Sequence, residues 1–314
     1  MTYRHIPAMP KEVMFYLNCQ PGKIYVDGTL GASGHARAIC EEISPDGLLI
    51  GIDRDGDAIT NAEHVLQPYG SNVRLFHGNF TRLADYLSEL NIAAVDGILI
   101  DLGLSLHQLK KSGRGFSFQK DEPLDMRMDI RSPTTAQVLV NRLAEAELGD
   151  LFRNFGEERW AKQIAHAITR IRKEKKIRSS KQLAQIVRNA VPKRAAAGQK
   201  IHPATRVFMA LRIAVNNELK NLDSFMGNVA DYLKPGGRLC VLSFHSLEDR
   251  IVKRHLKIME KGCICPPLVP TWVCGKSPVV RLLTKRVARP KKDEIAANPM
   301  ARSTREGLTI IVPN

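Results

Sequence analysis

The sequence contains no run of eighteen consecutive apolar residues, so it predicts no helix that spans a membrane and no membrane partner. Its first residues, MTYRHIPAMPKEVMF, lack the apolar core of a signal peptide. Six cysteines in 314 residues are too few for a disulfide framework. We therefore expect a cytoplasmic protein whose thiols are reduced and whose stability comes from a sizeable hydrophobic core.

Acidic residues are almost missing from one segment. Residues 159–206 carry 14 lysines and arginines but a single acidic residue, Glu174, whereas residues 1–108 carry 7 basic and 13 acidic residues. The whole chain has a formal net charge of +15. Such a one-sided block favours a polyanionic partner, most often nucleic acid, over the alternative of a helical face that is merely solvated. We expect phosphate contacts from a basic cluster formed by Arg170, Arg172, Lys173, Lys175, Lys176 and Arg178.

The first hundred residues alternate between apolar, strand-like runs and helical stretches. The strand-like runs are 24–28, 47–53, 72–77 and 95–101, and the helices between them are expected at 34–42, 55–66 and 81–90. Near-continuous apolar strands separated by helices predict a parallel sheet that is covered on both faces.

The alternation then stops and resumes late in the chain. Residues 103–135 show no period, and the periodic segments from 136 to 200 all look helical. The later elements are expected at 204–222 (a helix opened by Pro203), 234–244 (a strand), 246–261 (a helix) and 308–312 (a strand). We therefore predict an α/β fold in which residues 1–108 and 207–314 form a doubly wound sheet domain and residues 109–206 form a basic helical insert.

A glycine-rich turn follows the first expected strand. This turn, DGTLGASGH (27–35), is not a GxGxxG dinucleotide motif, and no lysine follows Gly34 as a phosphate-binding cradle would require. Asp27 opens the turn, and Asp53 and Asp101 end the second and fourth strands. Parallel strands end at a common edge, so these acids can converge on a ligand with a ribose, positive charge and no phosphate, such as S-adenosylmethionine. The alternative is a purely structural turn with capping aspartates.

The segment DLGLS (101–105) lies where many amino-methyltransferases have a short Asp-Pro-Pro-Tyr-like loop. The exocyclic amine of cytosine is a poor nucleophile, and an acceptor such as Asp101 can hold one N–H and orient the lone pair for methyl transfer. Ser243 and His245, in the segment SFHS, end the fifth strand at the same edge. Our candidate catalytic residues are therefore Asp101, His245 and Ser243, and the alternative for the last two is a turn held by their side chains.

Eight motifs occur in a fixed order along the chain. They are DGTLGASGH, GIDRD, DGILIDLGLS, RGFSF, PLDMRMD, HPATR, GGRL and SFHSLEDRIVK. Together they resemble the RsmH (MraW) family of bacterial methyltransferases, and the resemblance extends from His5 to about Ser303. It implies a Rossmann-like methyltransferase sheet with an inserted helical domain that recognises the substrate. It also implies S-adenosyl-L-methionine as methyl donor and, as target, the N4 amine of a cytidine in the decoding centre of 16S ribosomal RNA, met in the small ribosomal subunit or its precursor.

Two other functions stay open. A non-catalytic rRNA-binding assembly factor that retains a donor pocket is the main alternative. A DNA amino-methyltransferase is the third hypothesis, but it predicts a true Asp/Asn-Pro-Pro-Tyr loop, and this chain has DLGLS at that place.

The resemblance also implies which residues meet the donor. They are Ser33, Gly34 and His35 for the methionine part, Asp53 for the ribose, Phe80 for the adenine, and Asp101 and Gln108 to complete the site. One departure from the family pattern lies beside Gln108, where Leu106 and His107 replace a Ser-Pro pair.

Three cysteines near the C-terminal end need separate treatment. Cys263, Cys265 and Cys274 lie close in sequence, and some relatives have a fourth cysteine at the position of Trp272. Three thiols make an incomplete zinc site unless His255 or a water supplies the fourth ligand. We therefore expect reduced structural cysteines and no metal.

Overall fold

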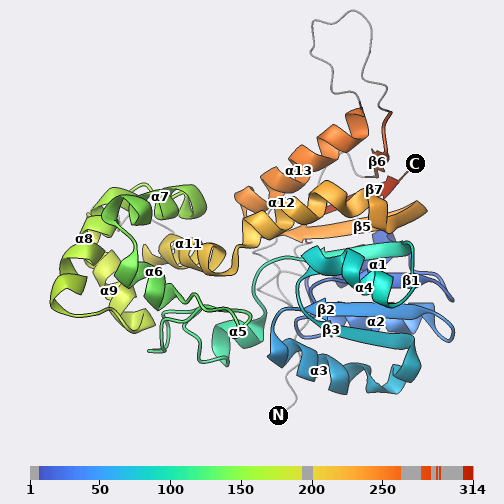
Figure 1. The fold of residues 1–314 in the computed structure, drawn as a ribbon, viewed down its shortest axis with the longest axis horizontal. Helices are drawn as coiled ribbons and strands as arrows, with labels where there is room; N and C mark the ends of the chain where they lie inside the picture. The colour runs from blue at the N-terminus through green and yellow to red at the C-terminus, as the bar shows by residue number, and fades with distance from the viewer. Residues whose placement is uncertain are drawn as a thin grey trace, which may run out of the picture. The chain divides into compact units, whose positions relative to one another are not determined.

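The chain forms two compact units (Figure 1). The computed structural model describes residues 7–192, 201–262, 277–283, 288, 290 and 307–313. One unit, here called the sheet unit, comprises Met1–Gly103 and Leu219–Asn314, and the other, the helical unit, comprises Leu104–Glu218. No helix among the described residues is long and apolar enough to cross a lipid bilayer.

The sheet unit contains a seven-stranded sheet within its described residues, in the order β3-β2-β1-β4-β5-β7-β6 (Figure 1). The strands are β1 (Ile24–Asp27), β2 (Leu48–Asp53), β3 (Val73–His77), β4 (Val95–Asp101), β5 (Leu233–Ser243), β6 (Val280–Leu282) and β7 (Gly307–Pro313). The first five run parallel, and β7 is antiparallel to both β5 and β6. The predicted α/β, Rossmann-like fold is confirmed. The chain order reverses between β1 and β4, where such sheets bind ligands outside the carboxyl ends of their strands.

Helices cover both faces of this sheet. On one face α1 (Pro10–Leu17), α2 (Gly34–Ile43) and α3 (Gly56–Leu66) share a core cluster with Leu49 and Leu99. On the other, α4 (Leu83–Glu89), α12 (Glu218–Asn228) and α13 (Ser246–Lys261) share a cluster with Ile50 and Ile98. Successive strand residues point to opposite faces, and both faces are buried, which explains why the strands are apolar almost throughout. Three short 3-10 helices, η1 (Gln67–Asn72), η2 (Phe80–Arg82) and η3 (Val229–Tyr232), complete the unit's described elements.

The helical unit has a hydrophobic core of its own. Its described helices are α5 (Leu106–Lys110), α6 (Ala136–Arg142), α7 (Glu145–Gly156), α8 (Ala161–Glu174), α9 (Ser180–Ala190) and α11 (Ala204–Asn216). Phe152, Ile164 and Leu211 are fully buried at its centre. The insert was predicted at residues 109–206, whereas the compact unit spans 104–218. Its C-terminal bound lies later than predicted because α11 packs against α7 and α9.

The helix expected over 204–222 is two helices, so this sequence prediction was wrong. Asn217 has a left-handed backbone with a φ of +51°, and its N–H donates to the carbonyls of Ile213 and Ala214. This is a C-terminal cap that ends α11, and α12 begins at the next residue. The break lies beside the boundary between the two units.

Candidate functional site

The turn between β1 and α2 brings its backbone very close to neighbouring strands. The N–H of Gly28 donates to the carbonyl of Leu99 at 2.9 Å, and a Cβ added to Gly28 would lie 2.5 Å from Cδ1 of Ile100. Gly31 has a left-handed φ of +48°, and its N–H donates to Oδ2 of Asp53 at 2.9 Å. Glycine is therefore required at 28 by close approach and is favoured at 31 by backbone conformation.

The three residues predicted to meet the methionine part of the donor lie at the start of α2. Ser33 is fully buried and has a left-handed φ of +64°, a strained conformation that the surrounding structure must hold. Gly34 is needed because a Cβ there would lie 2.9 Å from Cδ of Pro7. His35 is 5% exposed, and its Nε2 lies 3.7 Å from Oδ2 of Asp101. The turn and the end of β4 are thus close together.

Asp27, Asp53 and Asp101 lie at the carboxyl ends of the neighbouring strands β1, β2 and β4. Burial, with a contribution from the charge of Asp53, raises the pKa of Asp27 to about 7. Burial also raises the pKa of Asp53 to about 6. Burial and the charges of Asp27 and Glu248 hold the pKa of Asp101 well above its usual range. These acids influence one another's ionisation, and a cation bound among them would stabilise their charged forms.

Asp53 ties the glycine-rich turn to the end of β2. Its Oδ1 accepts the N–H of Asp55 at 2.8 Å, and its Oδ2 accepts the N–H of Gly31 at 2.9 Å. A carboxylate offers about four lone-pair directions, so two remain for further donors. Asp53 can therefore position the turn and still accept hydrogen bonds from a pair of ligand hydroxyls.

Two buried polar atoms at the ends of β4 and β5 have no hydrogen-bond partner among the described residues. They are Oδ1 of Asp101 and Oγ of Ser243. Asp101 is opposite Leu242 in the parallel register, so Ser243 follows directly beside it. Buried polar groups are normally paired, and an unpaired one is costly. A bound molecule that reaches both strand ends would satisfy these atoms.

His245 caps the N-terminal end of α13. It is the N-cap of α13, where its Nδ1 accepts the N–H of Glu248 at 3.4 Å and its Nε2 lies 3.0 Å from Oε1 of Glu248. The other carboxylate oxygen of Glu248 accepts the N–H groups of Phe244 and His245 at 2.9 and 3.3 Å. Nδ1 of His245 therefore serves the N-cap, whereas its buried Nε2 has no hydrogen-bond partner among the described residues, and a catalytic role for His245 stays a prediction. Glu248 was not predicted as a functional residue, although a glutamate three residues after an N-cap is a capping-box signal.

Phe80 begins η2 and packs on the glycine-rich turn. A Cβ added to Gly28 would lie 3.2 Å from Cβ of Phe80. The Phe80 ring makes an edge contact with Phe225, with ring centroids 5.2 Å apart. Phe80 is half-buried. The structure therefore brings it to the same turn as Ser33 and Gly34, and its contact with adenine stays a prediction.

Gln108 belongs to the helical unit, where it caps α5. Its Oε1 accepts the N–H of Ser105 at 3.0 Å, and its own N–H donates to Oγ of Ser105 at 3.2 Å. Gln108 is 6% exposed. Leu106 and His107, the departure from the family pattern, form the first turn of this helix. Gln108 thus has a structural role inside its own unit, and its part in donor binding stays a prediction.

The basic cluster lies at the end of α8 and in the segment that follows it. Its members are exposed except for Arg172, which is half-buried. Nη1 of Arg172 donates to the carbonyl of Val140 at 2.7 Å and so binds the C-terminal end of α6. The opposite side of α8 buries Ile164 and Ile168 in the core. Five members of the cluster thus face solvent, Arg172 also stabilises the fold, and the phosphate contacts of the cluster stay a prediction.

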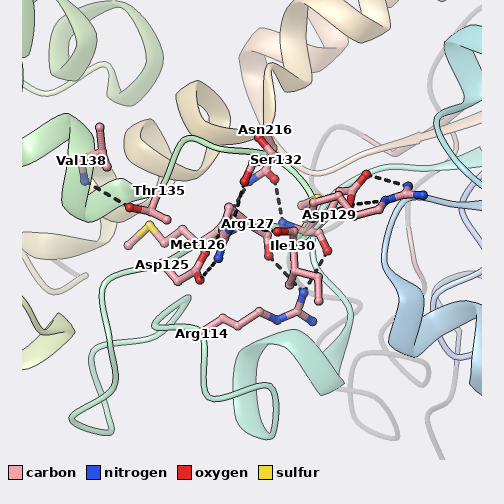
Figure 2. A network of polar contacts seen from close by, with 12 residues as sticks. Arg114, Asp125, Met126, Arg127, Asp129, Ile130, Ser132, Thr135, Val138 and Asn216 are labelled. Atoms are coloured by element: carbon pink, nitrogen blue, oxygen red, sulfur yellow. Dashed lines mark hydrogen bonds and ion pairs between the residues drawn. The ribbon is translucent and has the colours of Figure 1, made fainter.

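The loop that had no sequence period is ordered by charged side chains (Figure 2). Nε and Nη2 of Arg127 lie 2.7 and 2.8 Å from the two carboxylate oxygens of Asp125. Nη1 of Arg127 donates to the carbonyls of Ile130 and Ser132. Arg114 is 8% exposed and donates to the carbonyl of Arg127 at 3.0 Å. These paired contacts hold the PLDMRMD segment in one conformation.

A second set of contacts fastens this loop to α11 (Figure 2). The amide of Asn216 accepts the N–H of Met128 and donates to the carbonyl of Met126, both at 2.8 Å. Met126 is fully buried with a left-handed φ of +61°. The loop is therefore part of the helical unit's packed framework.

The possible zinc site depends on three cysteines that lie outside the described residues. They are Cys263, Cys265 and Cys274. Nε2 of His255, considered as a fourth ligand, lies 2.6 Å from Oδ1 of Asp223. Within the described residues, Cys19, Cys40 and Cys240 are buried and form no disulfide. Burial raises the pKa of both Cys19 and Cys40 to about 12, which disfavours their thiolate forms.

Comparison with known proteins matches nearly the whole chain. The model of the MraW methylase family matches residues 2–309. A protein of Desulfosudis oleivorans named ribosomal RNA small subunit methyltransferase H is 53% identical over 305 residues, which cover 97% of this chain and 98% of that protein. The protein of the same name from Geobacter sulfurreducens is 49% identical, with the same coverage. Among solved structures, TrmN from Thermus thermophilus superimposes with a TM-score of 0.43 at 11% identity, over 98% of this chain and 48% of that one.

Proposed function

Because the chain belongs to the MraW methylase family, as its motifs predicted, we propose that it methylates the N4 amine of a cytidine in the decoding centre of 16S ribosomal RNA, with S-adenosylmethionine as donor. The name shared by its relatives supports small-subunit ribosomal RNA as the substrate class. The particular base and atom come from the motif resemblance. The RNA would be met in the small ribosomal subunit or its precursor.

The observation that carries the donor assignment is the convergence of three acids, the buried Asp27 and the half-buried Asp53 and Asp101, beside a glycine-rich turn. S-adenosylmethionine carries a sulfonium, an ammonium and a ribose diol but no phosphate. Asp53 has lone pairs to spare for the diol. Burial raises the pKa values of Asp27 and Asp101, and a bound sulfonium or ammonium group would favour their charged forms. The unpaired Oδ1 of Asp101 is a buried acceptor that lacks a donor among the described residues. The residues present therefore fit this donor and would not suit a nucleoside phosphate.

For methyl transfer, the protein has to orient the cytosine amine toward the methyl group and to accept a proton. The bound donor supplies an electrophilic methyl group. Asp101 accepts an N–H of the cytosine amine and holds its lone pair toward that methyl group. Methyl transfer from the donor would leave N4 cationic, and Asp101 would take the proton that N4 then releases.

The helical unit would hold the RNA through its phosphates. The five exposed members of the basic cluster can replace counterions along the backbone. Their contacts carry no base specificity, so they position the RNA while the sheet unit reads the base. The target base has to leave its stack to reach the acids at the strand ends.

The proposed function is tested by methyl transfer to unmethylated small subunits. The protein is incubated with S-adenosylmethionine and the subunits, and digested nucleosides are identified by mass spectrometry. We expect N4-methylcytidine, and its loss in Asp101→Asn. Tight subunit binding with no methylated nucleoside would instead support the alternative, a non-catalytic assembly factor that retains the donor pocket.

A further inference from the structure

We infer that Phe244 supplies the aromatic surface on which the target base stacks while its amine faces Asp101. The inference rests on the proposed function, in which a pyrimidine leaves its stack and enters the site. A base that has left its stack is bound by stacking on aromatic or apolar side chains and by hydrogen bonds to its Watson–Crick edge. The segment DLGLS (101–105) contains no aromatic residue, so in this chain the aromatic surface has to come from another element.

Phe244 lies at the matching end of the neighbouring strand. β4 and β5 pair in parallel with Asp101 opposite Leu242, and the N–H of Leu102 donates to the carbonyl of Leu242 at 3.1 Å. The two chain segments stay side by side past their last paired residues, because a Cβ added to Gly103 would lie 3.3 Å from Cδ2 of Phe244. The Phe244 ring is therefore at the strand edge that holds the candidate acceptor.

Gly103 makes room for this ring. Its φ of +103° is a conformation that residues with side chains rarely adopt, and the missing Cβ lets the ring approach the backbone. The ring is half-buried and packs against the core cluster that includes Leu30 and Leu242. Part of its surface is therefore supported by the core and part remains accessible to a base.

The backbone that carries the ring is held by a buried carboxylate. Glu248 is 2% exposed, and its Oε2 accepts the N–H of Phe244 at 2.9 Å and that of His245 at 3.3 Å. Because the turn is held in place by buried contacts, little conformational entropy is lost when a base binds.

The two unpaired polar atoms belong to residues at the same strand ends as the ring. Ser243 directly precedes Phe244, and Asp101 lies at the adjoining strand end. A cytosine stacked on the ring carries an amine that can donate to Oδ1 of Asp101, and ring acceptors that can receive a hydrogen bond from Oγ of Ser243. One ligand would thus satisfy both atoms and use the accessible part of the ring.

The test compares Phe244→Leu, which keeps an apolar side chain, with Phe244→Tyr, which keeps an aromatic ring. Phe15→Leu is the matched control, because Phe15 is 73% exposed on α1 of the same unit. The kinetic constants for unmethylated small subunits are measured with labelled S-adenosylmethionine, and donor affinity is measured by calorimetry. We expect Phe244→Leu to lose about tenfold or more in kcat/KM with donor affinity unchanged. Phe244→Tyr should stay within about threefold of the unsubstituted protein, and Phe15→Leu should match it.

The outcomes separate this inference from the proposed function. Phe244→Leu with undiminished kcat/KM would overturn the inference while the proposed function stands. So would an equal loss in Phe244→Tyr, since the aromatic ring would then not be the property that matters, or a loss of donor binding in Phe244→Leu, which would mean that the ring only supports the fold. If the unsubstituted protein forms no N4-methylcytidine, both fail together.

Discussion

Replacing Asp27 with asparagine should make the protein more stable at alkaline pH and a weaker binder of its donor. Asp27 is 1% exposed, and its Oδ1 accepts the N–H of Thr29 at 3.1 Å. An asparagine keeps this acceptor and the shape of the side chain but carries no charge. The variant therefore isolates the free energy of burying a carboxylate at the end of β1.

The magnitude follows from the pKa of about 7 in the folded protein, against 3.8 for an ordinary aspartate. The folded protein binds this proton more tightly than the unfolded chain does. The carboxyl group therefore stabilises the fold at low pH, and this contribution is lost as the pH rises toward 7. Between about pH 5 and about pH 8 the unsubstituted protein should lose on the order of 2–3 kcal/mol in its free energy of unfolding through this group, and Asp27→Asn should not show this loss.

The assay is urea unfolding of both proteins at the two pH values, with donor affinity measured by calorimetry. Asp46→Asn, a change at an exposed acid, serves as the control and should shift stability equally at both pH values. If Asp27→Asn also shifts the unfolding free energy equally at both, Asp27 does not carry a raised pKa and the reasoning is refuted. Stronger or unchanged donor binding in Asp27→Asn would show that its charge does not face the cation.

The remaining predictions concern donor, RNA and chemistry. Asp53→Ala should weaken S-adenosylmethionine binding by about 1.5–3 kcal/mol in calorimetry, because it removes a charged acceptor for the ribose, and an unchanged affinity would contradict this role. Neutralising the five exposed members of the basic cluster should weaken RNA binding and lower its salt slope by about 0.7–0.9 for each phosphate that the protein no longer neutralises. Arg172→Ala should instead lower the melting temperature, since it removes the hydrogen bond to α6, and a melting temperature like that of the unsubstituted protein would refute its structural role. Asp101→Asn should slow single-turnover methyl transfer more than about tenfold at saturating donor and RNA, and a normal rate would limit Asp101 to binding.

Hydrophobic pattern alone was enough to predict the sheet and the edge at which the proposed donor site lies. The runs at 24–28, 47–53 and 95–101 are strands because they are apolar on both faces, as a parallel sheet between two helical layers requires. Once these strands are parallel, their carboxyl ends share one edge. The convergence of Asp27, Asp53 and Asp101 then follows from topology without knowledge of any side-chain conformation.

The helical unit shows where sequence periodicity stops being informative. A helix continuing through Asn217 and one capped there have nearly the same apolar pattern, and the capping conformation is one that asparagine tolerates. Whether α11 belongs to the sheet unit or the helical unit depends on which helices it packs against, a long-range choice that no local window contains. The loop containing Arg127 has no period because polar side-chain contacts order it (Figure 2).

By itself the sequence determined the fold class, the family and the acids at the strand ends, since these depend on hydrophobic period, residue order and chain topology. Only the tertiary structure decided which partners individual polar and aromatic side chains contact. In the structure, Arg172 donates to the carbonyl of Val140 in α6, His245 caps α13 beside Glu248, and Phe244 packs against Gly103. The physical reason is that a charged or aromatic side chain has several partners of similar energy within reach. The final packing of the surrounding backbone selects one of them.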